Sequence, residues 1–90
     1  MKFSVRTFEE GDIEKYVLVI KDKDVTLNIN IQGENPSQQF RDLIEKVKIG
    51  LPGNIGCISL IPVGDYVVMT IIISGMSSRY ISNITDLKFQ

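Results

Sequence analysis

The chain contains no histidine, and its only cysteine is Cys57. The absence of histidine removes the most common general base and the most common transition-metal ligand in proteins. A single cysteine cannot form an internal disulfide, and its neighbours Gly56 and Ile58 favour a small buried strand residue over an activated nucleophile. We therefore predict that the protein is not an enzyme and that it needs no cofactor and no metal ion.

The chain also lacks a marked charge excess and a long apolar run. A net charge of -1 and a pI near 5.3 argue against a general polyanion binder, so nucleic acid is not the partner that we expect. The longest apolar run, near residues 66–73, is far shorter than the roughly 20 residues that span a bilayer. Residues 1–4 show no cationic, apolar leader. These features favour a cytoplasmic protein that does not insert into a membrane.

Branched aliphatic residues are abundant, with 14 isoleucines and 8 valines against 6 leucines. Such side chains fit a pleated sheet better than a helix. Alternating apolar and polar residues predict strands near residues 3–7, 16–20 and 25–31, and apolar runs predict two more at 57–61 and 66–74. Residues 79–89 allow one more strand or a short helical turn.

One helix is predicted, beginning after Asn35. Asn35 is a typical N-cap residue, Pro36 suits the first helical position, and Gln38 is placed to complete a capping box. Apolar residues then recur at spacings of three and four, which is typical of an amphipathic helix with one buried stripe. These residues are Phe40, Leu43, Ile44 and Val47. Gly50 and Pro52 end the helix.

The sum of these elements is a single α+β domain over residues 1–90, in the order β-β-β-α-β-β-(β). We expect a mostly antiparallel sheet of five or six strands with one amphipathic helix. A helix over residues 36–49 would be roughly 21 Å long and roughly 10 Å wide, less than half the width of such a sheet. The sheet therefore either curls over itself or is covered by a second molecule, and the sequence leaves both open.

Charge is unevenly distributed, because 17 of the 21 charged residues lie in residues 1–50. A group of acidic residues surrounds the predicted first turn: Glu9, Glu10, Asp12 and Glu14. Their spacing matches no calcium loop, so we interpret them as a solvated hairpin tip that can steer a basic partner. The expected contact anchors are Tyr66, Arg79 and Tyr80, since aromatic residues and arginine dominate binding hot spots.

Residues 74–79 suggest a second kind of site. The hydroxyl groups of Ser77 and Ser78, exposed backbone amides and the guanidinium of Arg79 can converge on a phosphate, and a plain loop is the alternative interpretation. The loop over residues 50–56 has three glycines but no Gly-Lys-Ser/Thr ending, so we interpret it as a connector.

The function predicted from the sequence is a small, non-catalytic module that binds another protein. An inhibitor, immunity-type or adaptor protein of bacterial or phage origin fits this size and this lack of catalytic groups, and we expect a homodimer. One alternative is a phosphate-ligand or nucleic-acid binder that uses Ser77, Ser78 and Arg79. The other is a self-assembling structural subunit.

Overall fold

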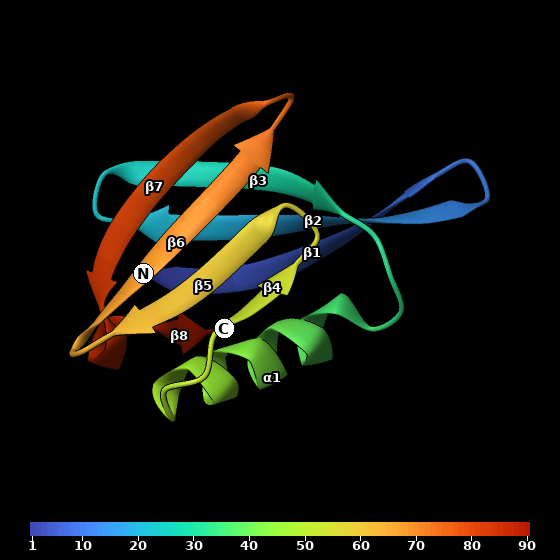
Figure 1. The fold of residues 1–90 in the computed structure, drawn as a ribbon. Coiled ribbons are helices and arrows are strands. Elements are labelled where there is room, and N and C mark those ends of the chain that lie inside the picture. Colours follow the sequence, from blue (N-terminus) through green and yellow to red (C-terminus); the bar gives the residue numbers. More distant parts are fainter.

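The structure is a computed structural model of residues 1–90, with one α-helix and eight strands arranged in two four-stranded sheets (Figure 1). The strands that precede the helix are β1 (Lys2–Glu10), β2 (Ile13–Asp22) and β3 (Val25–Ile31). After helix α1 (Pro36–Lys48) come β4 (Gly53–Ile55), β5 (Ile58–Val63), β6 (Tyr66–Ile73), β7 (Met76–Asn83), the 3₁₀ turn η1 (Ile84–Asp86) and β8 (Lys88–Phe89). Sheet A has the order β3-β2-β1-β8, and sheet B has the order β4-β5-β6-β7.

The predicted α+β class, the predominance of strands and the single helix are confirmed, but the prediction of one sheet of five or six strands is wrong. The structure has three further strands, of which the sequence allowed for only one, within residues 79–89. β4 lies in the loop interpreted as a connector, and β7 begins at Met76, where a break in the pattern was expected. β8 pairs in parallel with β1 through Lys2 and Phe3, and such short pairing leaves no periodic signal in the sequence.

Two-residue turns close the hairpins, and they determine the register of strands that hydrophobicity alone does not define. Ser74 and Gly75 both have positive φ, 52° and 78°, in the turn that joins β6 to β7. Two consecutive residues with positive φ match the right-handed twist of a hairpin. The turn therefore places Ile73 opposite Met76 and Met69 opposite Tyr80.

Helix α1 begins at Pro36 as predicted, but its N-terminus differs from the predicted capping box. Asn35 has φ 48° and ψ 59°, in the left-handed region, and its side chain makes no capping hydrogen bond. The Gln38 side chain instead donates to the Asp42 carboxylate at 2.9 Å. The first turn of the helix is thus supported by the Asn35 carbonyl, which accepts the N–H groups of Gln38 and Gln39.

The core lies between the two sheets, and α1 closes one side of it (Figure 1). The four residues of the predicted helix stripe are all buried, which confirms the stripe. Phe40 on the helix stacks on Phe3 of β1, with ring centroids 6.4 Å apart. The side chains of Val67, Met69 and Ile71 reach the same core from β6.

The division into two sheets explains how most of the apolar side chains are covered. The inner faces of sheets A and B cover each other, so the single helix needs to close only one side. Cover is incomplete, however, because Ile72 and Ile73 of β6 remain 54% and 52% exposed. On the face of β6 that points toward the core, Val67, Met69 and Ile71 are buried but Ile73 is not.

Candidate functional site

The most distinctive surface is the side of sheet B that faces away from the core. Alternation along the strands places one side chain row across β5, β6 and β7, formed by Ile61, Val68 and Ile81. The neighbouring row contains Val63 and Tyr66. Together with Ile72, these residues define what we call the outer face: Ile61, Val63, Tyr66, Val68, Ile72 and Ile81.

The outer face is apolar and exposed. Ile81 is 67% exposed, Val63 58% and Ile61 46%, while Val68 at the centre is half-buried. The helix packs on the other side of the molecule, against β4, β5, β1 and β8, and covers none of this surface (Figure 1). The row of Ser59, Thr70 and Arg79 separates Ile72 from the other apolar residues, which are contiguous. Exposed aliphatic side chains that are contiguous on a sheet are typical of a surface that binds another protein.

The predicted contact anchors lie on two different faces of sheet B. Tyr66 lies on the outer face and is 52% exposed. Arg79 borders the same face, opposite Thr70. Tyr80 points the other way, because successive strand residues alternate, and it packs half-buried against the core. The structure thus brings Tyr66 and Arg79 to one surface and gives Tyr80 a packing role.

The acidic residues lie on a hairpin that projects from the body of the protein (Figure 1). β3 pairs with β2 only from Tyr16 onward, so residues 8–15 pair only within the hairpin. We call residues 8–15 the arm. Every residue of the arm is exposed, including Phe8 and Ile13 at 42% and 63%. A two-stranded ribbon without further cover gains little stability of its own.

The arm concentrates negative charge more than its sequence suggests. Glu9 and Glu10 lie on β1 and not in the turn, and Glu9 is directly opposite Glu14 of β2. Like charges in such a cross-strand pair destabilise the hairpin. The only ion pair on the arm joins Lys15 Nζ to Glu10 Oε2 at 2.6 Å. Partial burial, and then the Glu14 carboxylate, raise the pKa of the Tyr16 phenol above its ordinary value.

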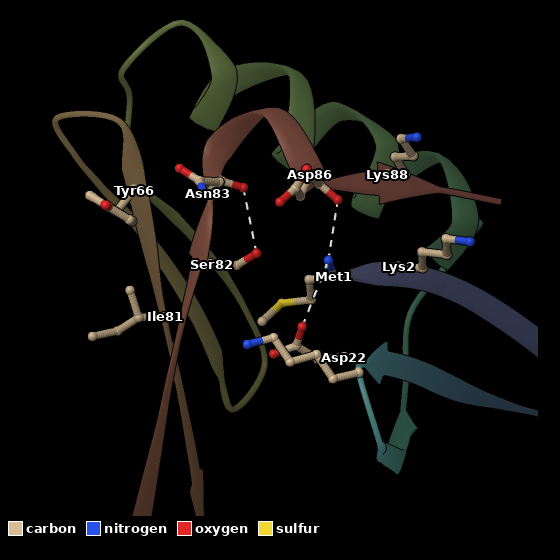
Figure 2. A pocket seen from close by; sticks show the side chains of 10 residues that line it. Met1, Lys2, Asp22, Tyr66, Ile81, Ser82, Asn83, Asp86 and Lys88 are labelled. Carbon is tan, nitrogen blue, oxygen red and sulfur yellow. Dashed lines mark hydrogen bonds and ion pairs between the residues drawn. The ribbon is translucent and has the colours of Figure 1, made fainter.

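A cavity of about 500 Å³ opens between the β2–β3 turn and the end of β7 (Figure 2). Figure 2 shows that Ser82 points toward Met1 while Tyr66 and Ile81 point away on the outer face. Charges of both signs line the cavity, from Lys2, Lys23, Lys88, Asp22 and Asp86. No buried polar side chain lacks a hydrogen-bond partner.

The residues of the predicted phosphate site do not converge. Ser77, Ser78 and Arg79 are successive residues of β7, so Ser78 points to the side of the sheet opposite from the other two. The segment is a strand and not a loop, and its amides therefore do not form a nest. Lys23, in the β2–β3 turn, lines the cavity of Figure 2.

Cys57 lies in the turn between β4 and β5 and not in a strand, which corrects the predicted strand boundary. It is half-buried against the core. No three Cys, Asp or Glu side chains come together in a geometry that could hold a metal ion. The thirteen-residue helix α1 is neither long nor apolar enough to cross a membrane.

Sequence reasoning identified the apolar character of Tyr66, Val68 and Ile72 but missed Ile61, Val63 and Ile81 as parts of the same surface. Ser59, Ile61 and Val63 stand at alternate positions of β5 and therefore share one face, so the sequence could have indicated Ile61 and Val63. Ile81 could not be found, because its position depends on the pairing of β7 with β6.

Comparisons with protein-family models, with curated proteins and with solved structures find no match for this chain.

Proposed function

We propose that this chain is a small, non-catalytic module that binds another protein through the outer face of sheet B. The observation that carries the proposal is the uncovered apolar group on β5, β6 and β7, described above. Complete burial of such aliphatic side chains stabilises a complex by about 1.5–3 kcal/mol for each side chain that starts fully exposed. Because these residues are half exposed, about 1 kcal/mol each is a reasonable scale.

The acidic arm supports the same proposal in a different role. It extends from the body as an exposed ribbon with four carboxylates and one lysine between Phe8 and Lys15. Negative charge concentrated in this way increases the rate at which a basic partner is captured and fixes its orientation. An inhibitor, immunity-type or adaptor protein in the cytoplasm is the biological role that we propose for such a module.

A substitution on the outer face tests the proposal directly. The immobilised chain would be used to capture proteins from its host, and the captured protein would then be purified and titrated by calorimetry. Ile61→Asp should weaken its binding at least tenfold, since a carboxylate would be buried at the interface without a partner. Asn28→Asp is the matched control, because Asn28 is exposed on β3 of the other sheet.

Two outcomes would contradict the proposal. In one, Ile61→Asp and Asn28→Asp bind the captured protein equally well. In the other, Asn28→Asp alone weakens binding, which would move the contact surface to sheet A. Circular dichroism of both variants would establish that the fold is retained, as expected for two exposed positions.

A self-assembling subunit is the second candidate, and a specific observation favours it. β7 is the last strand of sheet B, and no other strand pairs with its free edge. Light scattering over a concentration series tests self-association, and a chain that stays monomeric at high concentration would exclude this candidate.

A further inference from the structure

We propose that two copies of this chain pair through the free edges of their β7 strands. The two strands run antiparallel about a two-fold axis at Tyr80, and the two sheets B join into one continuous sheet. This inference deepens the second candidate function and does not depend on the first, because pairing side by side brings only Ile81 of the outer face into contact with the second copy.

The backbone of β7 presents a row of unpaired groups to solvent. Ile72 of β6 donates its N–H to the Cys57 carbonyl at 3.0 Å, so the backbone groups of Ile72 point toward β5. Those of the alternate residues Met69 and Ile71 therefore point toward β7. Met69 is paired with Tyr80, and the N–H and C=O groups of Ser77, Arg79 and Ile81 must consequently point away from the sheet. Water can bond to these groups one by one, and a second strand can pair with the whole row as a regular ladder.

The edge carries almost none of the features that normally prevent strand addition. Proteins protect their edges with short strands, prolines, lysines, bulges or a covering helix. β7 has eight residues, no proline, no lysine and one charged residue, Arg79. The edge strands β4 and β8 at the opposite side are very short and lie against α1.

The occupant that we infer is a second copy, because β7 pairs with itself without conflict in one register. When Tyr80 lies opposite Tyr80 of the second copy, Arg79 lies opposite Ile81 and Ser78 lies opposite Ser82. An aromatic pair, a serine pair and an arginine stem on an isoleucine are favourable neighbours in a sheet. A register with Arg79 opposite Arg79 of the second copy brings two like charges together. A register with Ile81 opposite Ile81 of the second copy shortens the overlap to residues 79–83.

The second long free edge, β3, is a less suitable surface for this pairing. Its outward-facing side chains are Thr26, Asn28 and Asn30, and asparagine is depleted in strands. Its outward face therefore offers no contact like that of Arg79 with Ile81, and its apolar residues Val25, Leu27 and Ile31 lie on the opposite face. A two-fold pairing uses the β7 edge of each copy, and neither copy has a second β7 edge to offer. The assembly therefore closes at a dimer and does not continue into a fibre.

Charge substitutions at Ile81 test the register as well as the dimer. Ile81 is 67% exposed, so its replacement should leave the fold intact. Ile81→Lys places a lysine beside Arg79 of the second copy and should raise the dimer dissociation constant at least tenfold. Ile81→Glu places a carboxylate beside the same arginine and should lower that constant or leave it unchanged.

The experiment is sedimentation velocity of the full chain over a concentration series, with circular dichroism of each variant. The wild type should dimerise, and Ile81→Lys with Arg79→Glu should restore the dimer that Ile81→Lys loses. Asn28→Lys on β3 is the control and should dimerise like the wild type. A wild type that stays monomeric at all concentrations would overturn the proposal, as would equal effects of Ile81→Lys and Ile81→Glu. In both cases a protein captured on the outer face would still leave the proposed function standing.

Discussion

At the scale of single residues, Gly53 shows how closely the helix packs on sheet B. A Cβ atom at this position would lie 2.5 Å from Cδ1 of Leu43, a helix residue that is only 5% exposed. Gly53→Ala should therefore force Leu43 to shift within the core and lower the free energy of unfolding by about 1–3 kcal/mol. Urea denaturation followed by circular dichroism measures this change.

Asn54→Ala is the control for that substitution, because Asn54 is the exposed neighbour of Gly53 on β4. Its effect should stay within about 0.5 kcal/mol. Equal stabilities of the two variants would show that the space between β4 and α1 is looser than the structure indicates.

Residues on the helix were the most predictable from the sequence, and residues at its N-terminus were less so. The spacing of Phe40, Leu43, Ile44 and Val47 depends only on helix geometry, and all four are buried as predicted. The conformation of Asn35 depends also on the chain that arrives from β3. Its left-handed backbone leaves no geometry for a side chain cap, and the predicted capping box with Gln38 therefore does not form.

At the scale of elements, the arm is a hairpin of low stability that carries four carboxylates. The double variant Glu9→Lys with Glu10→Lys reverses two charges of the arm. Glu9→Lys removes the repulsion between Glu9 and Glu14, which stabilises the hairpin, and Glu10→Lys removes the ion pair with Lys15, which destabilises it. Each effect is about 1 kcal/mol or less. The fold should therefore persist. Association with a basic partner at low salt should become about tenfold slower, because the steering charge is lost.

Stopped-flow or surface plasmon measurements of the association rate test this role with the purified captured protein. Glu34→Lys with Glu45→Lys is the matched control, since both residues are exposed, lie outside the arm and give the same change in net charge. The control should slow association much less than the arm variant. If both variants slow association equally, the arm has no particular role and only the net charge of the protein matters.

β6 and β7 show why some strands are predictable and others are not. β6 is buried on one face and half-covered on the other, so its apolar run alone predicted its limits to within a residue. β7 is a largely exposed edge strand, and its sequence Met-Ser-Ser-Arg-Tyr-Ile-Ser-Asn has no continuous alternation. Its pairing follows from the turn at Ser74 and Gly75, whose conformation is not apparent from hydrophobicity.

At the scale of the whole molecule, the sequence correctly indicated that one helix cannot cover all the apolar side chains. It could not indicate that the strands divide into two sheets, because this division depends on which strands pair over long separations in the chain. The parallel pairing of β8 with β1 is the clearest example. Once the sheets face each other, five of the twelve large apolar residues that stay exposed lie on the outer face of sheet B.

The outer face is thus what remains after the core has formed, and its role as a protein-binding surface is the central claim. Methyl cross-saturation from the bound, purified captured protein to labelled isoleucine and valine methyl groups of this chain tests that claim most directly. We predict intensity losses at Ile61, Val63, Val68 and Ile81, and none at Ile29 or Val47, which are buried in the core. Losses confined to exposed methyl groups elsewhere, such as those of Val25 on β3 or Ile49 after the helix, would contradict it.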